Sequence, residues 1–152
     1  MARRFVFELQ AVLEQRRRAE RNAQALLAQV QRERSEIEAQ MDSLREAVEA
    51  EREVTRGLMV GRVSVRSLRE HVAGELGSDR KARALALKLA GVQKRVDRAQ
   101  ALLREAAVHR EAIERLRERR YKAWLAELEK AERLEQDDLS VMRRGHADTA
   151  EG

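Results

Sequence analysis

Cysteine and proline are absent from the sequence, and aromatic side chains are scarce. Without cysteine the chain can form no disulfide, bind no metal through thiolates and use no thiol nucleophile, which suits a reducing compartment. Without proline no position is obliged to break a helix. Only 3% of the 152 residues are aromatic, so few large side chains are available to fill a globule of this length. We therefore expect one elongated domain over residues 1–152.

Charged and helix-forming residues take the place of the missing types. Charged residues make up 39% of the chain, against about 25% in typical globular domains. Ala, Leu, Arg, Glu and Gln are abundant, and all of them are strong helix formers. Because this composition is typical of long helices and coiled coils, we predict an all-α fold.

Charges of both signs are mixed along the chain. The net charge of +5 arises from 32 Lys and Arg against 27 Asp and Glu, and a basic excess can attract nucleic acid, anionic lipid or acidic protein. The densest basic stretches, near residues 16–18 and 115–122, are diluted by Glu14, Glu20, Glu114 and Glu118. We interpret them as the solvated exterior of a coiled coil, with an acidic partner surface as the alternative, and expect no nucleic-acid partner.

Membrane-crossing, secretory and catalytic signals are also missing. No apolar run approaches the roughly 18 residues that span a bilayer, and the opening MARRFVFELQ lacks the apolar segment of a secretory signal. The sequence has no glycine-rich phosphate loop, and His71, His109 and His146 have no partner at metal-ligand spacing. We therefore expect a cytoplasmic protein that is not an enzyme and has no cofactor, metal or small-molecule substrate.

Apolar residues with heptad spacing predict a first helix over about residues 3–56. They recur at Leu9, Val12, Ala19, Ala23, Leu26, Val30 and Ile37, then at Met41, Leu44 and Val48. Arg16 and Glu33 occupy the two missing positions, and two successive steps of four around Ile37 indicate a stutter.

The pattern fails over residues 57–79, which contain four glycines, at positions 57, 61, 74 and 77. Each glycine costs a helix about 1 kcal/mol relative to alanine, so we predict a glycine-containing connection here. Ser64 can cap a short helix through Val72, and Ser78 or Asp79 can cap the next long helix.

A second seam predicts a helix over about residues 80–144, with residues 145–152 disordered. Its members are Leu85, Leu89, Val92, Val96, Ala99, Leu103, Ala106, Ile113, Tyr121 or Trp124, Leu128, Ala131, Leu139 and Met142. If the two helices fold back on each other, facing position numbers have a constant sum, and a sum of about 151 matches apolar residues with apolar residues. The same register pairs the seam charges Arg16 and Glu135. We predict an antiparallel coiled-coil hairpin that is monomeric when free.

The first aromatic residues do not fit a single helical face. Phe5 and Phe7 would lie about 200° apart on a helix, so one partner helix cannot cover both. We therefore expect an aromatic end that inserts into another protein, with fraying of the terminus as the alternative. Trp124 lies on the seam side near Leu128, which favours core packing over an exposed binding anchor.

Two stretches of the chain resemble the flagellar FliJ family. FVFELQAVLEQRRRAERNAQALLAQVQRER, residues 5–34, is similar to the family's opening pattern of aromatic-x-aromatic-x-Leu-Gln-x-x-Leu before an Arg- and Glu-rich helix. IERLRERRYKAWLAELEKAERLEQDDLSVMRR, residues 113–144, is similar to the family's closing pattern, a Glu-x-Leu basic segment followed by Glu-Gln-x-x-Leu. With the glycine-bearing middle, the resemblance spans nearly the whole chain.

The resemblance implies a stalk-like coiled coil of the flagellar type III export apparatus, required for flagellum assembly and motility. The implied partners are the hexameric export ATPase, the membrane export-gate protein and export chaperones, at the cytoplasmic face of the inner membrane. The implied ATPase-binding end comprises Phe5, Phe7, Leu9, Leu13, Leu134, Leu139 and Met142. The implied gate surface comprises Leu68, Val72, Leu76 and Leu85.

Two alternatives share these sequence features. The stalk of a virulence type III secretion system would have the same fold and mechanism, and no residue separates it from the flagellar protein. A generic coiled-coil scaffold or nucleic-acid-binding zipper dimer is the more distant alternative. Its seams would be intermolecular, so its molecular mass in solution would depend on concentration.

Overall fold

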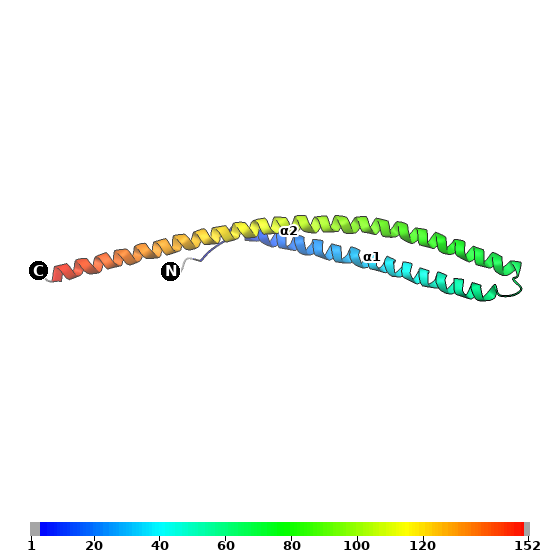
Figure 1. Ribbon diagram of the computed structural model, residues 1–152. Coiled ribbons are helices and arrows are strands. Elements are labelled where there is room, and N and C mark those ends of the chain that lie inside the picture. Colours follow the sequence, from blue (N-terminus) through cyan, green and yellow to red (C-terminus); the bar gives the residue numbers. More distant parts are fainter. Residues whose placement is uncertain (1–3, 151–152) are drawn as a thin grey trace. The chain divides into compact units, whose positions relative to one another are not determined.

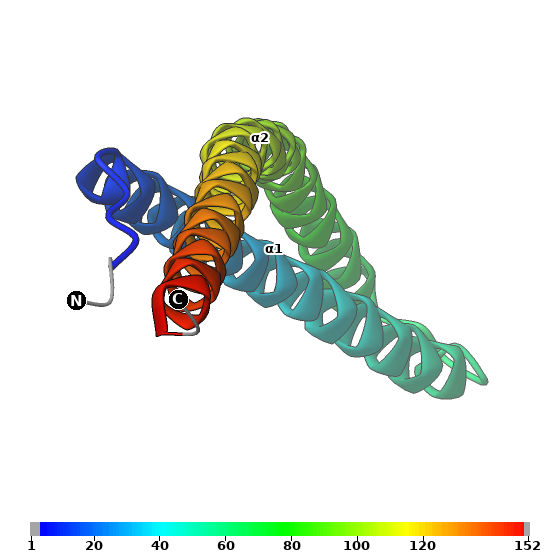
Figure 2. The same cartoon turned by 90° about the vertical axis from the view of Figure 1, so that its left-hand side faces the viewer.

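The computed structural model describes the backbone of residues 4–150 and the side chains of residues 4–142. Two helices account for nearly all of this range: α1 (Gln10–Leu58) and α2 (Val65–Ala150). A short connection, residues 59–64, joins them (Figure 1), and Figure 2 shows the same path from the side. The described residues contain no strand. The prediction of an all-α fold made of two long helices is therefore confirmed.

The helices pack as an antiparallel pair, in two compact units. One unit comprises Glu20–Glu105, and the other combines the residues up to Ala19 with those from Ala106 onward. Within Glu20–Glu105, Thr55 lies 3.0 Å from the His71 ring, and Glu33, farther from the connection, forms an ion pair with Arg95. Residues at increasing distance before the connection therefore contact residues at increasing distance after it, as in a helical hairpin. The antiparallel arrangement is confirmed.

The connection is held by backbone geometry and by a helix cap. Gly61 adopts φ = 124°, a conformation that glycine reaches without the steric cost other residues meet. The Ser64 hydroxyl accepts a hydrogen bond from the Ser67 backbone N–H at 3.1 Å, and the Ser64 carbonyl accepts one from the Leu68 N–H. Ser64 is therefore the N-cap of α2, as the sequence predicts.

The connection is shorter than predicted, and the helices are correspondingly longer. α2 begins at Val65 rather than near residue 80, and it includes Gly74 and Gly77. The helix capped by Ser64 does not stop at Val72, because a cost of about 1 kcal/mol per glycine is too small to end a helix that continues on both sides. Neither Ser78 nor Asp79 begins a helix, because both lie within α2.

The outer ends of the helices also differ from the predicted bounds. α1 begins at Gln10 rather than near residue 3, and it ends at Leu58. α2 continues through Ala150, past the predicted end at Arg144, so helix replaces the expected disorder up to that residue. Residues 151–152, the last of the predicted disordered tail, lie outside the described residues.

The register of the hairpin is the main correction to the sequence analysis. Arg52 and Glu75 form an ion pair, as do Glu33 and Arg95, so facing position numbers add up to about 127 rather than 151. The cause is the position of the turn, which lies at residues 59–64. A turn this early brings each residue of α1 opposite a residue of α2 that is nearer to the connection than predicted.

The core of the Glu20–Glu105 unit is a thin seam of aliphatic side chains. Val30, Val92 and Val96 are buried together, and Leu27 and Ile37 pack against them. The predicted α2 seam is confirmed here, since Leu85 and Leu89 are half-buried and Ala99 is buried.

The α1 seam differs by one position from the predicted one. Leu27 packs in the core, whereas Leu26 is 41% exposed. Among the half-buried or buried positions, 27, 30, 34, 37, 41, 44 and 48 follow regular steps of three and four, and positions 28 and 33 beside them are half-buried as well. With Arg34 in the spacing, the seam of α1 needs no stutter at Ile37.

Charged side chains cover the outside of both helices. Most of their ion pairs join residues three or four apart on one helix, such as Asp79 with Arg83 and Glu118 with Lys122. This arrangement is typical of a solvated coiled-coil exterior. Within the described range, neither helix contains a stretch long and apolar enough to cross a membrane.

Candidate partner-binding surfaces

An aromatic cluster joins residues 4–9, which we call the N-terminal stretch, to α2. The Phe5 ring centroid lies 5.3 Å from that of Tyr121 in an edge-to-face arrangement and 5.8 Å from that of Trp124. Tyr121 and Trp124 stack at 5.8 Å. All these separations fall within the favourable range for aromatic pairs. Trp124 therefore packs inside its own chain, as the core-packing interpretation predicts.

Phe7 is covered as well. It is only 7% exposed, and the Arg120 guanidinium lies 5.9 Å from its ring centroid, as in a cation–π contact. Arg120 also forms an ion pair with Glu8 at 3.4 Å, and Leu13 is fully buried. The prediction of an exposed aromatic end is wrong, because residues 4–7 are not helical. In an extended chain, residues i and i+2 share one side, so Phe5 and Phe7 can both face α2.

A cluster of charges lies beside the aromatic cluster, since Phe5, Tyr121, Arg17 and Glu114 line the same pocket. Arg17 donates a hydrogen bond to a Glu114 carboxylate oxygen at 2.9 Å, and Arg110 donates to the other oxygen. The hydrogen bond from Arg17, and then the contact with Arg110, hold the pKa of Glu114 below its ordinary value despite partial burial, which acts in the opposite direction.

This cluster takes the place of the predicted pair between Arg16 and Glu135. Both of those side chains are exposed, and the structure does not bring them together. Arg16 lies next to Arg17, whose partner is Glu114, so a residue as far along α2 as Glu135 is out of reach. Glu33, predicted to lie next to Arg117 or Glu118, instead pairs with Arg95.

Beyond Trp124, α2 has no helix packed against it within the part of the chain that the structure describes. We call residues 125–142 the α2 overhang. Its exposed apolar side chains are Leu134 and Leu139, each 58% exposed, Val141 at 66% and Met142 at 67%. The seam spacing nevertheless continues from Trp124 through Leu128 and Ala131 to Glu135 and Met142. Leu128 and Ala131 are half-buried, but no helix among the described residues covers the seam of the overhang.

The overhang is also acidic. Residues 125–142 contain six carboxylates, at positions 127, 129, 132, 135, 137 and 138, against one lysine and one arginine. One of the carboxylates, on Glu135, occupies a seam position. Two overhangs paired with each other would bring like charges together, which is unfavourable. This surface suits a different, basic partner better than a second copy of the chain.

The predicted ATPase-binding residues thus divide into two sets. Leu134, Leu139 and Met142 are exposed on the overhang. Phe5 and Leu9 are half-buried and Phe7 and Leu13 are buried, so these four are largely covered within the chain. The sequence does contain a signal for the overhang, which is the length of the second seam. With the connection at residues 59–64, this seam is much longer than the seam of α1 that it packs against.

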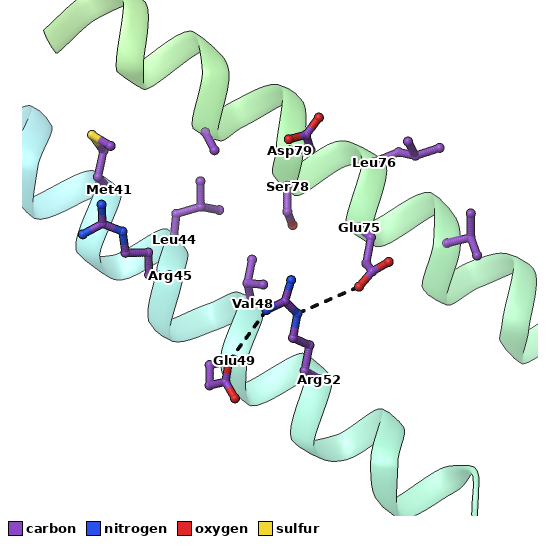
Figure 3. A pocket seen from close by; sticks show the side chains of 12 residues that line it. Met41, Leu44, Arg45, Val48, Glu49, Arg52, Glu75, Leu76, Ser78 and Asp79 are labelled. Carbon is purple, nitrogen blue, oxygen red and sulfur yellow. Dashed lines mark ion pairs between the residues drawn. The ribbon is translucent and has the colours of Figure 1, made fainter.

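A groove crosses the Glu20–Glu105 unit between the two helices (Figure 3). Its volume is about 640 Å³, and its apolar lining comes from Met41, Leu44 and Val48 of α1 and from Val72, Leu76 and Ala82 of α2. Arg52 lies between Glu49 and Glu75, with ion-pair distances of 3.9 Å to each (Figure 3). Apolar and charged side chains thus both line the groove.

Only part of the predicted gate surface belongs to this groove. Val72, 48% exposed, and Leu76, 55% exposed, line it. Leu68 is 44% exposed but lies outside the groove, and Leu85 is half-buried in the seam. The contribution of α1 was not predicted, because the predicted register placed Val48 opposite Leu103 rather than near Val72.

Comparison with known proteins identifies the family. A family model described as "Flagellar FliJ protein" matches residues 5–148. Comparisons with curated proteins and with solved structures find no match. The matched range contains the aromatic cluster, the connection, the groove and the described side chains of the overhang. The chain therefore belongs to the flagellar FliJ family and is a component of the flagellar protein-export apparatus.

Proposed function

We propose that the chain acts as a non-catalytic stalk that binds the hexameric export ATPase and links it to the membrane export gate and to export chaperones. In this role it works at the cytoplasmic face of the inner membrane and is needed for flagellum assembly and motility. Family membership supports the setting. The α2 overhang supports the specific interaction with the ATPase.

The observation that carries the proposal is the partnerless seam of the overhang. A single helix is about 10–12 Å across with its side chains, so it can enter a narrower opening than a helical pair can. Leu134, Leu139 and Met142 offer apolar contact area. The excess of carboxylates favours an opening lined with basic side chains.

The N-terminal stretch has a supporting role in this arrangement. Phe5 and Phe7 cover α2 immediately before the overhang begins. We infer that they fix the place where the helical pair ends and the single helix starts. Their contribution to ATPase binding is therefore indirect.

The groove lined by Met41, Val48, Val72 and Leu76 is the surface that we assign to the export gate. It is lined by both apolar and charged side chains, a combination that partner-binding surfaces share. Leu68 continues the exposed apolar surface of α2 toward the connection.

ATP hydrolysis by the export ATPase of the same organism tests the stalk proposal. We expect the wild-type chain to bind the assembled hexamer and to stimulate hydrolysis. The double variant Leu134→Asp, Leu139→Asp should lose both effects, because it places further charges on the apolar contact surface.

The matched control is Leu87→Asp, Leu102→Asp, which changes two leucines that are 77% and 51% exposed on α2 within the other unit. It should bind and stimulate as the wild type does, with unchanged helix content by circular dichroism. An overhang variant that stimulates normally would refute the assignment of the overhang. A wild-type chain that fails to bind the assembled hexamer would refute the stalk proposal itself.

A further inference from the structure

The hairpin tip, which we define as residues 56–69, has one sign of charge. It contains Arg56, Arg62, Arg66 and Arg69 and no aspartate or glutamate, and the nearest carboxylates are Glu53 and Glu70. Apart from the acidic overhang, the two signs are interspersed in the rest of the chain. The tip is thus a local positive patch.

Exposed aliphatic side chains lie among these arginines. Val60 is 86% exposed, and the two residues before it, Met59 and Leu58, are 48% and 67% exposed. Val63 and Val65, on the other side of Gly61, are 48% and 67% exposed. These five residues with exposed apolar side chains therefore lie within or next to the connection between α1 and α2. Clustered apolar exposure of this kind marks an interaction site.

Two of the arginines are not engaged by acidic neighbours. Arg56 pairs with Glu53 at 2.8 Å and Arg66 with Glu70 at 3.2 Å. Among the residues that the structure describes, Arg62 and Arg69 form no ion pair. Their guanidinium groups can therefore meet an external anion without first giving up an internal partner.

We infer that the hairpin tip binds directly to an anionic lipid surface. The aliphatic side chains of the turn enter the boundary between headgroups and acyl chains, and the arginines contact lipid phosphates, which guanidinium groups bind in a bidentate manner. An acidic protein would satisfy the arginines, but it would cover the aliphatic side chains only if it offered apolar contacts among its carboxylates. A bilayer accepts both kinds of side chain at once.

This inference goes beyond the stalk proposal, because it concerns lipid rather than protein partners and needs no other component. Gly61 explains why the tip can present such a compact apex, since its φ of 124° allows the turn to be completed in six residues. The exposed side chains on both sides of Gly61 then meet the membrane together.

Sedimentation with lipid vesicles tests the inference. Vesicles are made from equal parts of phosphatidylcholine and phosphatidylglycerol, or from phosphatidylcholine alone. We expect the full-length chain to bind the anionic vesicles and to remain in solution with the neutral ones. Each arginine near an anionic surface changes the affinity by about fivefold, so Arg62→Gln with Arg69→Gln should weaken binding by about 25-fold.

A matched control separates the tip from general charge attraction. Arg98→Gln with Arg104→Gln removes the same amount of charge from exposed positions of α2 in the same unit. This control should retain nearly wild-type binding. Equal losses in the two double variants, or wild-type chain that stays in solution with both vesicle types, would overturn the inference.

Two measurements test whether the aliphatic side chains of the tip contribute to vesicle binding. Met59→Ser with Val60→Ser should weaken binding to anionic vesicles while leaving the net charge unchanged. In a Trp124→Phe background, Val60→Trp places the only tryptophan at the tip, and its emission should shift to shorter wavelength when anionic vesicles are added. No spectral shift together with unchanged binding of the serine variant would show that the tip does not insert.

Discussion

The spacing of Phe5 and Phe7 shows how the conformation of a single stretch decides the role of its residues. Two residues apart, these side chains point to different sides of a helix but to the same side of an extended chain. In the structure residues 4–7 are not helical, and both rings lie against α2. The sequence identified these residues as important but could not show that they are covered.

Trp124 reports on this packing, because it is the only tryptophan. We expect Phe5→Ala to shift its fluorescence emission to longer wavelength and to lower the free energy of unfolding by about 1 kcal/mol, as loss of an aromatic pair should. Val6→Ala is the matched control, since Val6 is 75% exposed. Identical spectra for Phe5→Ala and the wild type would contradict the described cluster.

Glu114 gives a second prediction at this scale, through the pH dependence of stability. Its pKa is lowered in the folded state, chiefly by the hydrogen bond from Arg17. The stabilisation is therefore present above the ordinary carboxyl pKa and is lost as the pH falls through the lower folded value. Because the Glu114 side chain is 33% exposed, we expect Glu114→Gln to cost only about 0.5–1 kcal/mol at neutral pH.

The measurement is thermal unfolding of Glu114→Gln and wild type at neutral pH and in acid. The difference in Tm should shrink in acid. Glu129→Gln serves as control, because Glu129 is 64% exposed and its partner Arg133 lies on the same helix. A difference that grew as the pH fell would have the wrong sign for a lowered pKa.

At the scale of elements, the local heptad pattern predicted the seam of α2, whereas the position of the turn could not be predicted. The α2 seam around Val92, Val96 and Ala99 could be predicted because a heptad pattern depends only on nearby residues. The register could not, because it depends on which of several glycines ends a helix. Each glycine destabilises a helix by only about 1 kcal/mol, and packing against the other helix can offset this cost. The overhang was missed for the same reason, since it follows from the register.

The glycines themselves allow a matched test. Gly61→Ala should destabilise the chain by about 1–3 kcal/mol, because its backbone conformation strains any side chain. Gly77→Ala should stabilise it by about 0.5–1 kcal/mol, since Gly77 is helical and an added Cβ would meet no atom within 4 Å. Urea unfolding of both variants measures the two effects, and changes of the same sign would place the turn elsewhere.

Disulfide formation tests the register directly. Cysteines replacing Val30 and Val96, which are buried in one cluster, should cross-link within one chain under mild oxidation. Cysteines replacing Val48 and Leu103 belong to the register with a sum of 151 and should remain reduced. The opposite outcome would restore that register and remove the overhang.

At the scale of the whole molecule, the modest net charge of +5 conceals two regions of opposite sign. The overhang carries an excess of carboxylates, whereas the hairpin tip carries only arginines. Each also exposes aliphatic side chains, and they belong to different units of the chain. A component of an export apparatus that has two such surfaces can bind a basic protein partner through one and an anionic partner through the other.

The most direct test of the stalk proposal is site-specific photo-cross-linking in flagellated cells. A photoreactive amino acid replaces Leu139 on the overhang or, as control, Leu102, which is similarly exposed on α2 in the other unit. We predict that the Leu139 position cross-links to the export ATPase and that the Leu102 position does not. Cross-linking to the ATPase from Leu102 alone, or from neither position, would contradict the assignment of the overhang as the ATPase-binding element.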